Sequence, residues 1–477
     1  MKRNDFARQT LVLTVSSILA QFITAVVSIV LARLYTVEII GVWSIFLSIV
    51  SIVSCISSLR YEYAIVIPDK DDEAANIVVL GFSFLVVNCI SSLLILILLE
   101  KFGLFGFDQD CWQKIIMWLP VCIFGSGLFQ IFNYWCVRKE LFDFIAVRNV
   151  FNSLLSGILE IGFGLTMILG QEGVVIGSVL GTFCSGIFIA SVCIFRNRRV
   201  FFHSIKLKLL KDVFFRYKNF PLFSTWGVLL NQLSNTIATF MLSSFFSKTV
   251  VGYYSIAQQI ITLPIAFIGN AVGQVLYPNA VNALKNDYLS SLLDRTVKVL
   301  IELGVVPLLL IFLCAPQLCE LVYGEEWHVA GDYIRLLTPW TLIVFVVSPL
   351  TVIFDVMGKQ KLFSWINGGV FCARFVVLFL GGVFLDAEQV ILLYSIIGCL
   401  SFIIVGILIF RVSRCNIMRS FREIGKTSFK LVCKYLLVPS VLVICPVSGL
   451  FQVVCCVLFG LLFLVFDGKK IYFELRG

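Results

Sequence analysis

The sequence is poor in charge and almost without histidine. Of its 477 residues only 14% are charged and 2 are histidine, whereas 60% are hydrophobic. A water-soluble domain of this size has too little interior to hide so much apolar surface, so lipid must be the solvent for most of the chain. A histidine-rich metal site is excluded as well, and we expect neither a metal nor a cofactor.

The motifs that carry catalysis are also missing. The chain has no glycine-rich phosphate-binding loop, no histidine beside a candidate nucleophile and no Cys-x-x-Cys pair among its 16 cysteines. Most of these cysteines stand inside apolar runs, where cysteine behaves as a small hydrophobic residue. The long outward loop typical of glycan polymerases and glycosyltransferases is absent too. We therefore expect a transporter and not an enzyme.

Apolar runs long enough to cross a bilayer follow one another along the chain. They predict an all-α polytopic membrane protein with about 14 transmembrane helices. The first run is too long for the apolar part of a cleaved signal peptide, so we interpret it as an uncleaved span. The predicted spans are 10–31, 38–58, 77–99, 114–134, 147–169, 172–194, 221–244, 250–275, 296–315, 333–355, 362–384, 388–410, 431–447 and 449–466.

Lys and Arg are distributed unevenly among the segments that join these spans. If the N-terminus is cytoplasmic, about thirty of them lie in inward segments, Arg148 included, and about four in outward segments. This asymmetry predicts that both termini are cytoplasmic. The two most basic stretches, 195–220 and 411–430, lack the aromatic platforms and motifs of nucleic-acid binding. We interpret them as topogenic charge with some attraction to anionic lipid, and expect no nucleic acid partner.

Two stretches of the chain are similar at a separation of 211 residues. Residues 34–45 read LYTVEIIGVWSI and residues 245–256 read FFSKTVVGYYSI, so that Gly41 aligns with Gly252. Six spans precede the basic stretch 195–220, and the seventh span therefore starts from the same side as the first. Parallel repeats of this kind predict two lobes related by a pseudo-twofold axis along the membrane normal. The predicted organisation is an N-terminal lobe at 1–200, a cytoplasmic basic linker at 201–220, a C-terminal lobe at 221–411, and two extra spans with a cytoplasmic tail at 412–477.

Polar side chains inside the spans are the candidate substrate contacts, because each costs several kcal/mol unless it is hydrated or paired. Arg374 lies near the middle of its span and either grips a phosphate or belongs to a structural ion pair. Glu160 either binds a proton or pairs with an arginine. The amides of Asn231, Gln232 and Asn235 suit sugar hydroxyls and interhelical hydrogen bonds equally well.

Charged residues at the predicted cytoplasmic ends of spans form a second group of candidates. Arg60 and Glu62 interrupt an apolar stretch, either in an aqueous cavity or as an interfacial anchor beside tyrosines. Arg138 and Lys139 lie at the cytoplasmic mouth, where they either capture an anionic headgroup or serve as topogenic charge. Pro264 stands inside the eighth span, where we expect it to kink the helix.

Five segments carry a family resemblance: LARLYT at 31–36, RYEYAIVIP at 60–68 with the acidic DKDDEAAN at 69–76, FPLFS at 220–224 and SIAQQIITLPIAFIGNAVGQVLYP at 255–278. Together they resemble the polysaccharide-export branch of the multidrug/oligosaccharidyl-lipid/polysaccharide exporter superfamily, the Wzx-type O-antigen and capsule flippases. The resemblance covers the chain from the first span through the twelfth. It implies a two-lobed bundle like that of the MATE transporters.

The resemblance also implies a function. Such proteins move an undecaprenyl-diphosphate-linked oligosaccharide, an O-antigen, capsule or exopolysaccharide repeat unit, from the cytoplasmic to the outer leaflet of a bacterial inner membrane by alternating access. Membrane lipids, a polysaccharide polymerase and a chain-length regulator would be its partners, and we expect a monomer. Related lipid flippases use several basic residues in the first lobe, but the first span here has none between Arg8 and Arg33. Arg60 and Arg374 are the candidates for the diphosphate or for an acidic sugar, and the amides at 231, 232 and 235 are the candidates for the glycan.

Two other functions are weighed against this one. A MATE-like cation-coupled exporter of small molecules needs a cavity dominated by carboxylates, whereas these spans hold one deep glutamate and one deep arginine. A glycan polymerase needs the large outward loop that is missing. Both are weaker hypotheses than the flippase.

Overall fold

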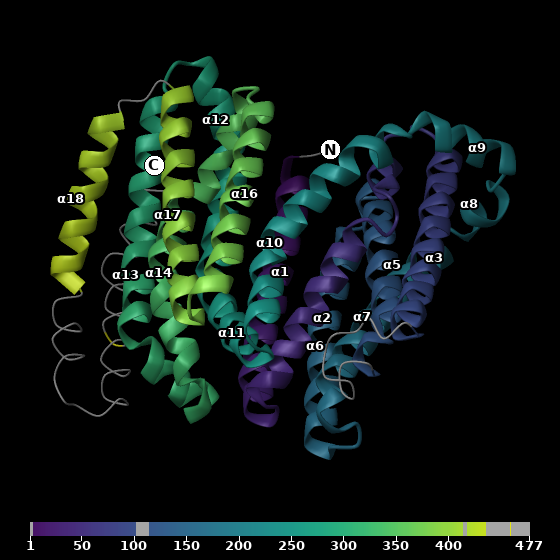
Figure 1. The fold of residues 1–477 in the computed structure, drawn as a ribbon. Helices are drawn as coiled ribbons and strands as arrows, with labels where there is room; N and C mark the ends of the chain where they lie inside the picture. The colour runs from purple at the N-terminus through teal and green to yellow at the C-terminus, as the bar shows by residue number, and fades with distance from the viewer. Residues whose placement is uncertain (1–2, 102–113, 414–416, 436–457, 459–477) are drawn as a thin grey trace. The chain divides into compact units, whose positions relative to one another are not determined.

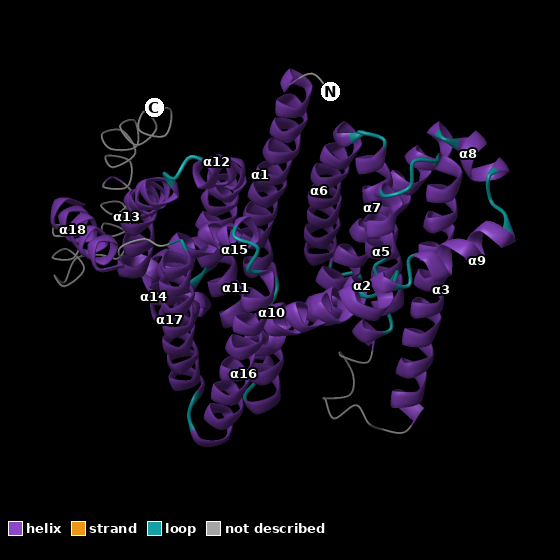
Figure 2. Ribbon diagram, turned by 90° about the horizontal axis from the view of Figure 1, so that it is seen from above, coloured by secondary structure: helices purple, strands orange, loops and turns teal. Residues whose placement is uncertain are grey.

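The computed structural model describes residues 3–101, 114–413, 417–435 and 458, and every regular element in them is helical (Figures 1 and 2). Within these residues, 11 helical segments are long and apolar enough to span a bilayer. This confirms the expectation of an all-α polytopic membrane protein.

The described spans differ from the predicted set at two places. Helix α10 (Thr225–Phe245) occupies the seventh predicted span but is not one of the 11, because its amides and hydroxyls make it less apolar than the others. The last two predicted spans, 431–447 and 449–466, lie outside the described residues apart from residue 458 and the end of α18 (Ile417–Tyr435).

The chain divides into two compact units, Met1–Phe240 and Met241–Gly477, and the boundary falls inside α10. The first unit contains α1 (Arg3–Leu34), α2 (Val37–Cys55), η1 (Tyr61–Val66), α3 (Asp71–Lys101), α5 (Leu119–Arg138), α6 (Phe142–Thr166), η2 (Gly170–Glu172), α7 (Gly173–Arg196), α8 (Arg198–His203), α9 (Leu207–Arg216), η3 (Phe220–Ser224) and most of α10. The second contains α11 (Lys248–Pro264), η4 (Ile265–Gly269), α12 (Asn270–Lys285), α13 (Leu289–Tyr323), η5 (Glu325–Trp327), α14 (His328–Val347), η6 (Ser348–Thr351), α15 (Val352–Val356), α16 (Gln360–Phe384), α17 (Ala387–Val412) and α18.

In the first unit, α7 lies against both α5 and α6 by way of glycines. A Cβ atom on Gly125 of α5 would lie 2.6 Å from the Phe183 Cα of α7. A Cβ atom on Gly177 of α7 would likewise lie 2.6 Å from the amide nitrogen of Glu160 in α6. No side chain fits at either place, so the helices approach at backbone distance. This close packing holds Glu160 in the interior of the unit.

In the second unit, α14 packs against α11, α13 and α17. A Cβ atom on Gly398 of α17 would lie 2.7 Å from the indole ring of Trp340 in α14. The indole therefore lies directly on the α17 backbone. Helix α16 packs on α17 as well, which brings its side chains next to this ring.

The eighth predicted span changes its helical form at the proline. Helix α11 is α-helical up to Pro264, a π-helical turn follows at Ile265–Gly269, and α12 continues from Asn270. Proline removes a backbone donor and clashes with the preceding turn. The α-helical pattern is thus interrupted where the sequence predicts a kink.

The two similar stretches of sequence fold alike. Helix α1 ends at Leu34 and α2 begins at Val37, while α10 ends at Phe245 and α11 begins at Lys248. Both pairs of boundaries are separated by the same 211 positions as the sequence repeat. The residues before the second helix of each pair have extended backbones, with ψ of 155° and 162°. The similarity is therefore structural as well as sequential.

Candidate functional site

A strained turn leads from α2 into η1 and carries the first pair of predicted site residues. Leu59 and Arg60 have φ of 50° and 64°, which is unfavourable for residues with a Cβ atom. The turn places Arg60 Nη1 3.6 Å from Glu62 Oε1 and the Arg60 guanidinium carbon 3.8 Å from the centre of the Tyr63 ring. Strain of this kind persists only where surrounding contacts impose it.

Glu62 is only 1% exposed and accepts a hydrogen bond from the Ser58 hydroxyl. Burial raises the pKa of Glu62, whereas the Ser58 hydrogen bond and the Arg60 charge act in the opposite direction. The structure thus brings Arg60 and Glu62 together as an ion pair. Their contact with a substrate stays a prediction.

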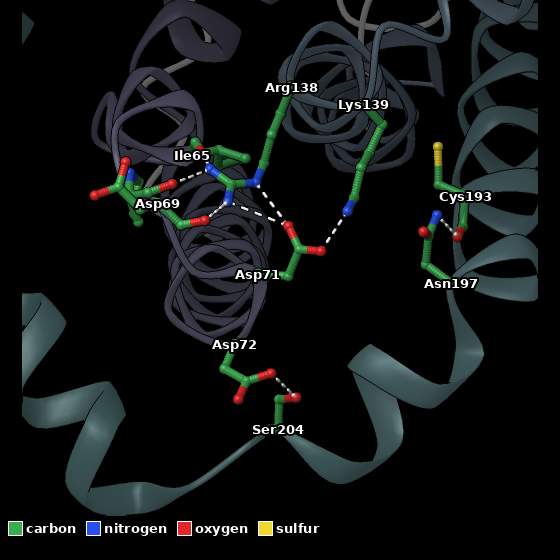
Figure 3. Close-up of polar contacts among 10 residues, drawn as sticks. Ile65, Asp69, Asp71, Asp72, Arg138, Lys139, Cys193, Asn197 and Ser204 are labelled. Carbon is green, nitrogen blue, oxygen red and sulfur yellow. Dashed lines mark hydrogen bonds and ion pairs between the residues drawn. The ribbon is translucent and has the colours of Figure 1, made fainter.

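Arg138 and Lys139, at the end of α5, hold the chain that follows this turn. The Arg138 guanidinium donates to the carbonyls of Ile65, Pro68 and Asp69, and its Nη2 lies 3.2 Å from Asp71 Oδ1. Lys139 pairs with the other Asp71 oxygen, and both cations point at this carboxylate (Figure 3). We call Arg60, Glu62, Asp71, Arg138 and Lys139 the turn network. In this conformation Arg138 holds backbone carbonyls and Asp71, Lys139 pairs with Asp71, and Arg60 pairs with Glu62. Capture of a headgroup by Arg138 and Lys139 stays a prediction.

The acidic segment at the start of α3 also binds the basic stretch that follows α7. The Asp72 carboxylate accepts from the Ser204 hydroxyl (Figure 3). Asn76 donates to the Ser204 carbonyl at 2.8 Å and accepts from the Lys206 amide at 3.2 Å. Glu73 pairs with Arg216 at 2.9 Å. The DKDDEAAN segment therefore binds residues of the basic stretch 195–220, which we interpret from the sequence as topogenic charge.

Glu160 lies in α6, is 5% exposed, and has no ion pair or side-chain hydrogen bond among the described residues. Its backbone carbonyl accepts the Tyr35 hydroxyl at 2.9 Å. Burial first, and then the Glu160 carboxylate, raise the pKa of Tyr35 to about 12. The sequence predicts that Glu160 either binds a proton or pairs with an arginine. Among the described residues, the pair with an arginine is not formed.

Arg148 is a buried cation that the charge count misassigned to an inward loop. Helix α6 begins at Phe142, five residues earlier than the predicted span, and Arg148 lies inside it with 8% exposure. Its guanidinium carbon lies 3.5 Å from the centre of the Phe129 ring, and its Nε has no partner. Among the described residues it makes no ion pair. The apolar FDFIAV run before it was the available signal that the span starts earlier.

Arg374, in α16, is 7% exposed and lies against two aromatic rings that contact each other edge to face. Its guanidinium carbon lies 5.0 Å from the centre of the Trp340 ring and 5.6 Å from that of Tyr394. Among the described residues its Nε has no hydrogen-bond partner, and no carboxylate pairs with it. We call Arg374, Trp340 and Tyr394 the Arg374 cage. The structural ion pair considered for Arg374 is thus not formed within the described residues.

The amides of α10 divide into two groups. The Gln232 Nε2 donates to the Ser51 hydroxyl of α2 at 2.9 Å, which is an interhelical hydrogen bond. Asn231 and Asn235 are exposed and lie one turn apart on α10, so they share a face. Asn231 and Asn235 are therefore the two amides of α10 that the fold leaves exposed, and contact of the α10 amides with a glycan stays a prediction.

Comparisons with known proteins identify the family and the fold. A family model described as "Polysaccharide biosynthesis protein" matches residues 30–332. The teichuronic acid biosynthesis protein TuaB of Bacillus subtilis (strain 168) is 24% identical over 311 residues. That match covers 65% of this chain and 62% of the relative, so the chain spans less than two thirds of the relative's length.

Solved structures show the same fold. Lipid II flippase MurJ in an inward closed conformation superposes with a TM-score of 0.70 at 15% identity, covering 98% of this chain and 100% of that one. An inward-facing MATE multidrug transporter of the MOP superfamily has a TM-score of 0.62 at 18% identity, covering 83% and 95%. A MOP superfamily transporter from Pyrococcus furiosus reaches 0.58 at 15% identity, covering 85% and 95%. The predicted MATE-like fold is thereby confirmed.

Proposed function

Because this chain belongs to the family of polysaccharide biosynthesis proteins, we propose that it flips a polyprenyl-diphosphate-linked oligosaccharide from the cytoplasmic to the outer leaflet of a bacterial inner membrane. The substrate headgroup carries sugars and two phosphates, whose transfer through hydrocarbon is prohibitively costly without polar partners. A membrane bundle that offers cations and amides lowers this cost while the polyprenyl chain stays in lipid. Alternating access then moves the headgroup without moving the tail out of the bilayer.

The observation that carries this proposal is the Arg374 cage. An arginine buried in a membrane helix without a carboxylate is costly, and such residues mark ligand or ion pathways. Two aromatic faces stabilise the cation but leave the guanidinium edge available, and that edge fits phosphate bidentately. We assign Arg374 to the diphosphate and Asn231 and Asn235 to glycan hydroxyls.

Arg148 joins this group as a second phosphate ligand, on the same physical grounds. It too stacks on an aromatic ring, at 3.5 Å, and has no described anionic partner. Arg60, Glu62, Arg138 and Lys139 are proposed to act earlier, when the headgroup arrives from the cytoplasmic side. Substrate phosphates would then compete with Asp71 for Arg138 and Lys139, and with Glu62 for Arg60.

The experiment is a flipping assay in proteoliposomes with a fluorescent undecaprenyl-diphosphate-linked disaccharide as the probe. Wild-type protein should expose the probe to an external quencher. We expect Arg374→Ala and Arg148→Ala to slow this at least tenfold, since each removes a charge-assisted contact of about 1.5–3 kcal/mol. Arg374→Lys should restore part of the rate. Arg335→Ala is the matched control, because Arg335 donates to the Phe312 and Leu313 carbonyls instead of awaiting a ligand. A wild-type protein that leaves the probe in place would refute the flippase function.

We further propose that Glu160 couples this movement to protons. An ionised carboxylate without a countercharge has a high free energy inside the bundle. Glu160 would therefore be protonated when the bundle closes it off from water and ionised when the bundle opens it to water. Other titratable or charged groups lie where α1 and α6 end and α7 begins. They are Tyr35, the exposed Arg33, and the Glu172–Lys114 pair at 3.6 Å. Glu160→Gln should keep downhill flipping but lose its acceleration by an imposed pH gradient, whereas Glu172→Gln should keep both.

A cation-exporting function is the second candidate, and the buried Glu160 is the observation that favours it. Export of ethidium from proteoliposomes, lost in Glu160→Gln, would support that function over the flippase.

For the flippase we also propose cytoplasmic termini, a monomer, and cooperation with a polysaccharide polymerase and a chain-length regulator. Accessibility of single introduced cysteines to a membrane-impermeant thiol reagent tests the orientation.

A further inference from the structure

Helix α9 has two apolar faces, and the fold covers only one of them. Val213 is buried, and α9 packs on α3 along that side. The other side exposes Leu207 by 89% and Phe215 by 56%, and Phe214 is partly exposed beside them. Residues 207, 211 and 215 are four apart, so Leu207, Lys211 and Phe215 line one stripe of the helix. This exposed stripe therefore mixes large apolar side chains with a lysine.

The charge of the exposed side is basic. Lys208 and Lys211 are exposed among the apolar residues, and Lys206 precedes the helix. Arg216 is directed instead to Glu73 of α3, and Asp212 is the acidic residue of α9. Apolar side chains next to lysines whose stems can extend past them are typical of helices that lie in the plane of a membrane surface.

Phe214, at the edge of the exposed side of α9, connects this helix directly to the strained turn. The Tyr61 hydroxyl donates to the Phe214 carbonyl at 3.1 Å, and the two rings stack at 6.3 Å between centroids. The Phe84 ring of α3 stacks on both of them. Tyr61 is the residue between Arg60 and Glu62. One hydrogen bond and one aromatic stack therefore connect α9 to the turn that carries the Arg60–Glu62 pair.

We propose that α9 is an anionic-lipid binding element that lies in the headgroup layer and steadies the Arg60–Glu62 turn from there. The basic charge of its exposed stripe selects anionic over zwitterionic lipid, and Leu207 and Phe215 enter the upper acyl region. The binding does not depend on the proposed flippase function. Only its consequence for transport rests on that function.

Hydrogen exchange of the protein in nanodiscs tests the binding without any substrate. In phosphatidylcholine discs that contain phosphatidylglycerol, the amides of residues 207–216 should exchange about tenfold more slowly than in phosphatidylcholine alone. Residues 61–66 should slow with them. The double variant Lys208→Gln/Lys211→Gln should lose this lipid dependence, and Arg198→Gln/Arg199→Gln on the neighbouring α8 should keep it.

The outcomes separate the two proposals. Equal exchange of α9 in both discs overturns the lipid site, and equal exchange combined with protection by another protein of the polysaccharide machinery points to a protein partner instead. Slowing of α9 without slowing of residues 61–66 overturns the link to the turn. In the flipping assay, the Lys208→Gln/Lys211→Gln variant should lose a several-fold stimulation by phosphatidylglycerol. A wild-type protein that binds the lipid and flips nothing would refute the flippase and leave the lipid site standing.

Discussion

Arg138 in the first unit donates to three backbone carbonyls and pairs with Asp71, whereas Arg374 in the second unit has two aromatic rings around it and no described carboxylate. Both are largely buried arginines at helix positions. The first is fully engaged by its own chain and organises backbone. The second is held by its own chain only through the two rings, and we propose that a substrate anion completes it. The difference separates an arginine whose donors the fold uses in this conformation from one with no described anionic partner.

Stability and transport should therefore respond in opposite ways to the two arginines. Arg138→Ala leaves Asp71 and three carbonyls without their donor, and we expect a loss of about 2 kcal/mol, moderated because Asp71 is partly exposed. Arg374→Met removes a buried uncompensated charge and should leave the protein as stable or more stable, while flipping is lost. Thermal unfolding in detergent, read beside the flipping assay, checks both. A large loss of stability in Arg374→Met would remove the distinction between the two arginines.

The turn network should also depend on pH in a defined direction. The folded-state pKa of Glu62 lies above the unfolded value of about 4.3, so the native state binds this proton more tightly. The stability that Glu62 contributes is then complete below the unfolded pKa and is lost as pH rises through the folded pKa. Glu62→Gln should unfold at a less pH-dependent temperature than wild type, with the larger difference on the neutral side. Identical pH profiles of the two proteins would contradict this assignment.

The smallest expected effect compares the two repeated hairpins. The Ser247 hydroxyl accepts from the Val250 amide at 3.2 Å and caps α11, whereas Thr36 makes no such bond at the start of α2. Ser247→Ala should cost about 0.5–1 kcal/mol, and Thr36→Ala clearly less. Chemical unfolding of the two variants measures the difference. Equal losses would mean that the caps of the repeats are equivalent in energy despite their different contacts.

The sequence by itself determined the class of the protein. An apolar composition and runs of bilayer length leave only membrane helices as a solution, because lipid offers no partners to an open backbone. The repeat predicted equivalent hairpins at 34–45 and 245–256, and the helix boundaries agree with it. The membrane helices and their repeated boundaries depend on local composition and residue spacing, and both can be read directly from the sequence.

Tertiary structure alone decided which polar residues are paired. Arg60, Arg138, Arg148 and Arg374 look alike in sequence, yet Asp71 and Glu62 reach two of them and aromatic rings meet the other two. Arg148 was missed because it is the second residue of the predicted span 147–169 and was counted with the inward loop, whereas α6 starts at Phe142 and places it well inside the helix. Arg60 and Glu62 are two residues apart, but the other partners come from separate helices, such as α3 with α5 and α14 with α16. Which carboxylate an arginine meets on another helix depends on how the helices pack, and the hydrophobic periodicity of the sequence does not encode that packing.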